Sequence, residues 1–206
     1  MKKIGIIDYG MGNLHSVENA LKYIGLSSFI SNDKNELSHA DGLILPGVGA
    51  FPDAIELLSS LSFPEFIREE TEKKPLLGIC LGMQLLFEKS YEFKESDGLG
   101  YIKGSVVKLR AGQTDKTYKI PHIGYNGIKK INTCPLLDGI DDGTCFYFVH
   151  SYMGQCTDKA QLVATTEYGE DVTAIVSSGN VYGTQFHPEK SGEAGLTLLK
   201  NFGKIL

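Results

Sequence analysis

A cysteine between two glycines is the residue of this chain best suited to covalent chemistry. Cys80 ends the apolar run Leu76–Ile79, has Gly78 and Gly82 two residues away on either side, and precedes an apolar stretch with a helical pattern. This pattern is typical of a nucleophile elbow, a tight strand-to-helix turn that exposes one side chain in a cleft. The unpaired N–H groups of a helix N-terminus favour the thiolate, the reactive form of cysteine. Free cysteines are also often buried in cores, so the hypothesis needs support from other residues.

A base and a group that orients it occur together near the end of the chain. His187 directly follows an apolar run, which predicts a position at a sheet edge, and Pro188 restricts it to an extended or turn conformation. Glu189 lies two residues further on, so in an extended segment both side chains point to the same face. A carboxylate there can fix the imidazole tautomer and stabilise the imidazolium. We therefore predict a catalytic triad of Cys80, His187 and Glu189.

The other histidines are weaker candidates for the base. His15 lies in a predicted helix, His39 in a polar loop and His122 directly after Pro121. His150 follows the apolar run 146–149, and we interpret it as a residue in the wall of the site. Neither the histidines nor the cysteines have metal-ligand spacing such as HExxH or CxxC, so no metal is expected.

The oxyanion of a covalent intermediate needs backbone N–H donors. Leu81, directly after the nucleophile, is one donor in the elbow geometry. The turn Pro46-Gly47-Val48-Gly49 follows a neighbouring predicted strand and is the candidate for the second donor, because glycine lets a peptide approach a ligand closely or change its orientation. This turn lacks the third glycine of a dinucleotide fingerprint, and the chain has no P-loop. We expect no nucleotide cofactor.

The elements that position these residues alternate between strands and helices in the first part of the chain. Apolar runs at 4–7, 27–31, 42–45 and 76–79 predict buried strands. Helical patterns follow over 14–24, with Gly25 as C-cap, and from Pro52 to Leu61. This order predicts an α/β fold, an open, doubly wound, mixed but mainly parallel sheet with helices on both faces. Ligands bind such sheets outside the carboxyl ends of the strands, where the glycine-rich turns would meet.

The second half of the chain has a different pattern, which predicts a smaller antiparallel portion. Short connections join the predicted strands, which suggests antiparallel pairing, and a helix over 193–202 closes the chain. We predict one domain over residues 1–206, with polar, glycine-rich mobile loops at 90–104 and 110–126. The predicted strands of this half are 105–109, 127–131, 145–149, 162–166, 173–176 and 181–185.

Composition excludes several classes of function. The chain has 206 residues and a formal net charge of −5, so it has no broad basic surface for nucleic acid. No apolar run reaches the length of a membrane span, and the N-terminal run 4–7 is too short for the core of a signal peptide. The four cysteines have no close pairing, and we interpret Cys134, Cys145 and Cys156 as packing residues. These features predict a cytoplasmic protein with reduced thiols.

Taken together, the motifs resemble the class I, triad-type glutamine amidotransferases. The chain has the family's segments around Cys80 and His187 in the family's order. Within the class it is most similar to the glutaminase subunits of imidazole glycerol phosphate synthase, an enzyme of histidine biosynthesis. Four further stretches carry this closer resemblance, namely residues 8–14, 45–51, 121–126 and 146–152.

The resemblance implies that the single domain hydrolyses L-glutamine to glutamate and ammonia through a thioester on the cysteine. It further implies that Gln84 and Glu92 contact the substrate and that the backbone around Ser151 and Tyr152 holds its amino-acid end. Ammonia would pass through a channel to a (β/α)8-barrel synthase subunit, the heterodimer partner, for formation of imidazole glycerol phosphate and AICAR. The residues implied at the partner interface are Asn13, Tyr125, Tyr147 and Lys190.

One departure from the family leaves the partner open. The family usually has tryptophan at the position of Tyr125, in a segment that faces the partner, whereas this chain contains no tryptophan. The same glutaminase chemistry feeding a sugar amidotransferase of surface-polysaccharide synthesis is therefore an alternative. A catalytically silent binding subunit on the same fold is a third hypothesis, against which the intact Cys80, His187 and Glu189 argue. A small cysteine peptidase would leave the further family stretches unexplained.

Overall fold

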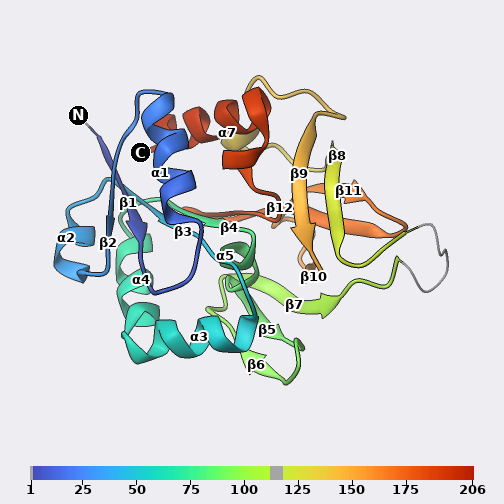
Figure 1. Cartoon of the computed structure of the whole chain (residues 1–206), viewed down its shortest axis with the longest axis horizontal. Helices are drawn as coiled ribbons and strands as arrows, with labels where there is room; N and C mark the ends of the chain where they lie inside the picture. The colour runs from blue at the N-terminus through green and yellow to red at the C-terminus, as the bar shows by residue number, and fades with distance from the viewer. Residues whose placement is uncertain (1, 112–117) are drawn as a thin grey trace.

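A nine-stranded sheet runs through the molecule and divides it into two layers of helices (Figure 1). The computed structural model describes residues 2–111 and 118–206. The strand order in the sheet is β2-β1-β3-β4-β13-β12-β11-β8-β9. The bounds are β1 Lys3–Ile7, β2 Ser27–Ser31, β3 Gly42–Leu45, β4 Leu76–Ile79, β8 His122–Lys130, β9 Cys145–His150, β11 Leu162–Glu167, β12 Asp171–Ser178 and β13 Val181–Thr184.

The first half of this sheet is parallel, as the alternation of strands and helices predicts. Strands β1 to β4 and β13 all pair in parallel, and β3 and β4 are buried along their whole length. Such strands read as continuous apolar runs because helices cover both faces. Helices α1 (Leu14–Tyr23) and α7 (Gly192–Ile205) pack on one face, and α2 (Lys34–Ser38), α3 (Phe51–Ser60) and α4 (Phe63–Thr71) pack on the other. The predicted fold class is confirmed.

The second half is antiparallel, and it continues the same sheet. Strand β13 pairs in parallel with β4 on one side and antiparallel with β12 on the other, so it joins the two halves. Strands β12, β11, β8 and β9 follow in antiparallel order. This junction brings the end of β13, which leads to His187, beside the end of β4, which leads to Cys80. The 3-10 turn η1 (Pro135–Leu137) lies between β8 and β9 and packs against α7, and η2 (Pro188–Lys190) leads from β13 to α7.

A second, four-stranded sheet corrects one of the two loop predictions. Its order is β10-β7-β5-β6, with bounds β5 Phe87–Ser90, β6 Ser96–Asp97, β7 Ile102–Lys108 and β10 Tyr152–Cys156. The prediction of a loop over 90–104 is therefore wrong in part, because β6 and the start of β7 pair here with β5. Of the predicted loop 110–126, residues 112–117 lie outside the described part, and β8 already begins at His122. The helix after Cys80, α5, spans only Leu81–Gln84.

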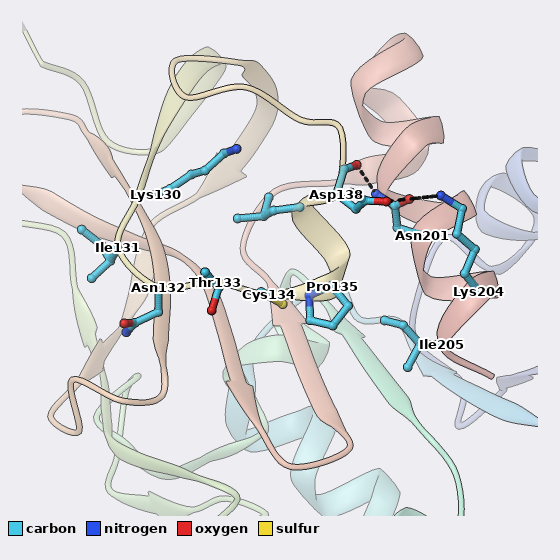
Figure 2. A pocket seen from close by; sticks show the side chains of 11 residues that line it. Lys130, Ile131, Asn132, Thr133, Cys134, Pro135, Asp138, Asn201, Lys204 and Ile205 are labelled. Carbon is cyan, nitrogen blue, oxygen red and sulfur yellow. Dashed lines mark hydrogen bonds and ion pairs between the residues drawn. The ribbon is translucent and has the colours of Figure 1, made fainter.

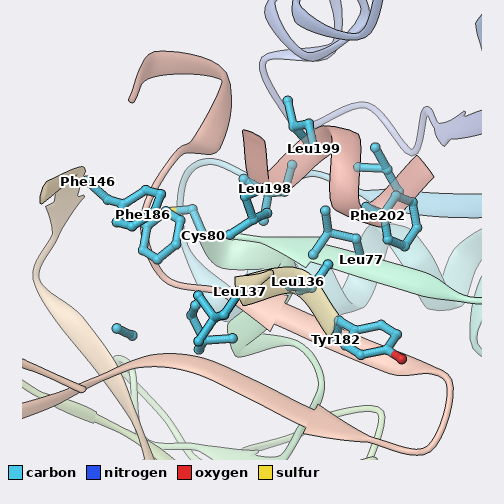
Figure 3. Packing of buried hydrophobic residues seen from close by; sticks show 14 of the residues in the cluster. Leu77, Cys80, Leu136, Leu137, Phe146, Tyr182, Phe186, Leu198, Leu199 and Phe202 are labelled. Carbon is cyan, nitrogen blue, oxygen red and sulfur yellow. The ribbon is translucent and has the colours of Figure 1, made fainter. Parts of the chain in front are cut away.

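The nucleophile candidate sits on the hydrophobic core. Figure 3 shows Cys80 beside Phe186, with α7 residues such as Leu198 covering the same cluster. Phe146 and Phe186 stack with ring centroids 4.1 Å apart. All four cysteines are free thiols, and Cys145 is exposed, so its interpretation as a packing residue is wrong. Among residues 2–111 and 118–206, no helix is both long and apolar enough to cross a membrane.

Candidate active site

The turn at Cys80 has the strained geometry of a nucleophile elbow. Cys80 has φ 55° and ψ −110°, a conformation that residues with a side chain rarely adopt. Its N–H donates to the Thr184 carbonyl at 2.7 Å, which ties the elbow to the end of β13. The flanking glycines are required by close packing, because a Cβ on Gly82 would run into the Leu45 carbonyl and one on Gly78 would lie 2.7 Å from the Gly82 carbonyl oxygen. Strain held by the surrounding packing is common at functional residues.

His187 and Glu189 form the predicted pair. His187 Nδ1 lies 2.8 Å from Glu189 Oε1, and their side chains are 3% and 1% exposed. The backbone holds the turn, since the His187 N–H donates to the Tyr147 carbonyl at 2.9 Å and the Ser191 hydroxyl donates to the His187 carbonyl at 2.6 Å. With Nδ1 bound to the carboxylate, Nε2 is the nitrogen left for Cys80.

The partners of His187 outweigh the effect of its burial. Burial alone disfavours the cation, but hydrogen bonds and charge interactions with Cys80 and Glu189 raise the pKa of His187 to about 9. The imidazolium is therefore the form present at neutral pH.

Two hydrogen-bonded buried glutamines lie next to Cys80, and one of them was missed from the sequence. Gln185 is fully buried and its amide nitrogen lies 3.8 Å from Cys80 Sγ, within hydrogen-bonding range of sulfur. Its side-chain oxygen accepts from Gln84 Nε2 at 3.1 Å, and the same Gln84 nitrogen also donates to the Tyr152 carbonyl at 2.8 Å. Both Gln84 amide hydrogens are thus used within the protein, which leaves Oε1 for a substrate. Gln185 could have been found because alternation along an extended segment puts it on the same face as His187.

The predicted oxyanion donors lie at the same sheet edge. Leu81 is the first residue of α5, so the helix offers no carbonyl to its N–H. Gly47 follows β3 and packs closely against the turn that follows β4. A Cβ on Gly47 would lie 2.8 Å from the Gly82 nitrogen. Val48 is 37% exposed and Gly49 has φ 96°. The turn therefore faces the elbow and is free of side-chain bulk at Gly47.

These residues line one small pocket. Its volume is about 310 Å³, at the low end of the range typical of sites for small metabolites. Of the predicted site residues, Gly47 and Glu189 lie behind the wall, and Tyr125 and Tyr147 lie outside it. The lining residues are Asn13, Val48, Gly49, Cys80, Leu81, Gln84, Glu92, Val149, His150, Ser151, Tyr152, His187 and Lys190.

The polar wall opposite the elbow has few groups left for a ligand. Glu92 is buried, and its Oε2 accepts the Phe51 N–H at 2.8 Å, which leaves Oε1. Burial raises the pKa of Glu92, while the bond from Phe51 opposes this shift. The Ser151 carbonyl accepts from the Leu109 N–H at 3.0 Å, and the Tyr152 carbonyl accepts from two donors. A substrate therefore cannot use the Tyr152 carbonyl.

His150 lies in the pocket wall, as predicted, and it is engaged on both ring nitrogens. Its Nδ1 lies 2.9 Å from the Tyr152 carbonyl, which can only accept, so this nitrogen carries the proton. Its Nε2 lies 3.1 Å from Nδ1 of His122, a buried residue that the sequence did not connect to the site. Burial and the neighbouring His122 lower the pKa of His150 to about 3. His150 is therefore neutral, and its Nε2 faces His122 rather than Cys80, so it is not the candidate base.

The predicted interface residues gather beside the pocket mouth. Tyr125 is 59% exposed, its hydroxyl donates to the Lys190 carbonyl at 2.8 Å, and its ring lies 5.5 Å from that of Tyr147. Asn13 is the N-cap of α1, yet its side chain makes no capping hydrogen bond to the described residues.

Two of the weaker histidine candidates do not line the pocket. His15 is exposed on α1, and His39 lies at the end of α2, where a polar loop was expected.

A larger cavity of about 790 Å³ lies between η1 and α7 (Figure 2). The buried polar side chain in its wall, Asn201, already has its hydrogen bonds within the protein. Asn201 Nδ2 donates to the Leu136 and Asp138 carbonyls, and Asn201 Oδ1 accepts from Lys204.

The small pocket, with the strained cysteine and the histidine–carboxylate pair, is the candidate active site. In the described ranges, no group of three or more His, Cys, Asp and Glu residues could hold a metal ion.

Comparison with known proteins identifies the class. The profile of the family described as "Glutamine amidotransferase class-I" matches residues 5–206, so the chain belongs to the class-I glutamine amidotransferase family. This confirms the family and the enzyme class predicted from the sequence.

Two full-length relatives show which members of the family the chain is similar to. The chain is 52% identical over 204 residues to the imidazole glycerol phosphate synthase subunit HisH of Caldanaerobacter subterraneus subsp. tengcongensis, with 98% of each chain covered. It is 51% identical to the subunit of the same name from Bacillus cereus, with 98% of this chain and 95% of the relative covered. The closer resemblance predicted from the sequence is therefore also confirmed.

Two solved structures have a fold similar to that of this chain. A putative GMP synthase protein from Thermoplasma acidophilum superposes with a TM-score of 0.74 at 23% identity, covering 100% of this chain and 94% of that chain. PurLQS from Thermotoga maritima superposes with a TM-score of 0.75 at 20% identity, covering 98% of both chains. At these identities the likeness concerns the fold alone.

Proposed function

We propose that the chain is a single cytoplasmic glutaminase unit that hydrolyses L-glutamine to glutamate and ammonia through a thioester on Cys80. The ammonia passes to a (β/α)8-barrel synthase subunit that forms imidazole glycerol phosphate and AICAR in histidine biosynthesis. The observation that carries the proposal is the strained Cys80 at the end of β4, in one pocket with a His187 whose Nδ1 lies 2.8 Å from Glu189.

The chemistry starts from the ion pair of Cys80 and His187. The thiolate attacks the side-chain amide carbon of glutamine, and the N–H groups of Leu81 and of Val48 or Gly49 stabilise the tetrahedral oxyanion. His187 donates its proton to the departing ammonia, which leaves the γ-glutamyl thioester. His187 then takes a proton from water, the hydroxide attacks the thioester, and glutamate and the free thiol are released.

Substrate specificity follows from the groups that the pocket leaves free. Glu92 Oε1 accepts from the α-ammonium group of glutamine, and Gln84 Oε1 accepts from a second N–H of the substrate. The α-carboxylate only accepts hydrogen bonds, so the backbone N–H groups around Ser151 and Tyr152 hold it. The pocket of about 310 Å³ suits a free amino acid and is small for a peptide.

The surface beside the pocket is the proposed partner interface. Ammonia that escaped into water would become ammonium and lose its nucleophilicity, so the acceptor site must close over the pocket. Asn13, Tyr125, Tyr147 and Lys190 surround the mouth and supply aromatic and polar contacts for such a closure. Binding of the partner's ligand turns the Gly47–Val48 peptide into the orientation that accepts the oxyanion, which couples the two reactions.

Glutamate release tests this proposal. The purified chain alone should hydrolyse glutamine slowly, and the chain mixed with a barrel synthase and its nucleotide ligand should hydrolyse it fast. Cys80→Ala should abolish the reaction, whereas Cys145→Ala, which removes an exposed free thiol, should leave it intact. High activity without a partner would contradict the gated subunit. Co-purification of a sugar enzyme in place of the barrel would favour the polysaccharide alternative.

A further inference from the structure

One buried hydroxyl under the site has no role in this mechanism. Tyr9 follows β1, at the carboxyl edge of the sheet, and is 1% exposed. Its hydroxyl makes no hydrogen bond to the residues that the structure describes. A buried polar group without a partner is destabilising, so its presence calls for a physical reason.

The hydroxyl lies directly against the oxyanion turn. A Cβ built on Gly47 would lie 2.9 Å from the Tyr9 oxygen and 2.9 Å from Leu81 Cβ, so Tyr9 packs on the inner side of this glycine. Burial and the nearby charge of Cys80 both raise the pKa of Tyr9. The phenol therefore stays protonated and is a hydrogen-bond donor at every working pH.

The turn itself is held loosely. In the described part of the chain, the carbonyl of Gly47 and the N–H groups of Val48 and Gly49 take part in no hydrogen bond. In a trans peptide the N–H and the C=O point in opposite directions. When the Val48 N–H faces an oxyanion in the pocket, the Gly47 carbonyl must point inward, to the side where the Tyr9 hydroxyl lies.

We propose that Tyr9 is a positioning residue that donates a hydrogen bond to the Gly47 carbonyl when the Val48 amide faces Cys80. This bond stabilises the oxyanion-accepting orientation of the turn over the other orientation. Tyr9 touches neither the substrate nor the reacting atoms, so it acts only through the turn. The inference rests on the proposed function, because it requires an oxyanion at Cys80.

The test compares Tyr9→Phe with Ser28→Ala in the complex with the barrel synthase and its nucleotide ligand. Ser28 on β2 has the same defect, a buried hydroxyl without a partner in residues 2–111 and 118–206, at the far edge of the sheet. We expect Tyr9→Phe to lower kcat for glutamine hydrolysis about tenfold, the loss of one ordinary hydrogen bond, with KM unchanged. Ser28→Ala should keep the parent kcat.

Two further readouts separate positioning from structural damage. Alkylation of Cys80 by iodoacetamide forms no oxyanion, so its rate should be the same in Tyr9→Phe and parent, and the melting temperature should not fall. A kcat within twofold of the parent, an equal loss in Ser28→Ala, or a parallel loss of alkylation would overturn the role of Tyr9. If the parent complex itself released no glutamate, the proposed function would fail instead.

Discussion

Two buried histidines share one pocket and have opposite acid–base properties. His187 and His150 are 3% and 6% exposed, so burial disfavours the cation in both. The pKa of His187 is nevertheless raised to about 9, whereas that of His150 is lowered to about 3. The difference comes from their partners, a carboxylate and a thiol for His187, and a second histidine and a carbonyl for His150. Charged partners, rather than burial, decide which of the two histidines is protonated.

Replacing each of these two histidines by glutamine should have the largest and most unequal effects on activity. We expect His187→Gln to lower kcat/KM for glutamine hydrolysis by on the order of a thousandfold or more, because it removes the proton donor and acceptor of every step. His150→Gln should cost less than about tenfold, since its ring is neutral and engaged within the protein. Steady-state glutamate release by the partner-bound enzyme measures both. His15→Gln, exposed on α1, is the control, and equal losses for His187 and His150 would contradict the assignment.

Removing the carboxylate of Glu189 should lower the pKa of His187, and so bring it closer to the low pKa of His150. Glu189→Gln keeps the shape of the side chain but removes a charge and weakens the hold on the tautomer, so we expect a loss of at least about a hundredfold in kcat. In the parent, the imidazolium is present up to about pH 9, so activity should decline as pH rises through this value. In Glu189→Gln this alkaline limb should move to lower pH.

A pH profile of kcat/KM checks this prediction. The same raised pKa means that the contribution of His187 to folding stability is complete below its ordinary pKa and is lost as pH rises through about 9. An alkaline limb that stays in place in Glu189→Gln would show that the carboxylate does not set the acidity of His187.

A further effect concerns folding stability in acid, which changes gradually with pH. His150 keeps its neutral form down to about pH 3, whereas in the unfolded chain it takes up a proton near its ordinary pKa of about 6.5. Between these values the unfolded state binds more protons, so the free energy of unfolding falls with falling pH by about 1.4 kcal/mol per unit for this one proton. Urea titrations at several pH values should show a slope that is smaller by this amount in His150→Gln. An unchanged slope would mean that His150 is already charged in the folded protein.

The parallel half of the fold, and the position of Cys80, His187 and Glu189 at one edge of the sheet, could be predicted from the sequence because their signals are local. Strands β3 and β4 are uninterrupted apolar runs, and Cys80 and the pair His187 and Glu189 lie in short motifs whose spacing determines which face they share. Strand β5, with the sequence Phe-Glu-Lys-Ser, has no such pattern and forms because β7 pairs with it.

The parts of the site that could not be predicted depend on contacts between distant segments. His122 meets His150 because β8 pairs antiparallel with β9 in a register that sets these two residues opposite each other. The position of Tyr9 against Gly47 depends on the packing of two turns from neighbouring strands. Neither contact leaves a signal in local spacing.

The most direct test of the central claim is to identify the covalent intermediate. Acid-quenched samples of the partner-bound enzyme, taken during turnover of isotopically labelled glutamine, can be digested and mapped by mass spectrometry. We expect a γ-glutamyl group on the peptide that contains Cys80, and its absence in Cys80→Ala. Steady release of glutamate with no label on Cys80, or with the label on Cys134, Cys145 or Cys156, would rule out Cys80 as the nucleophile.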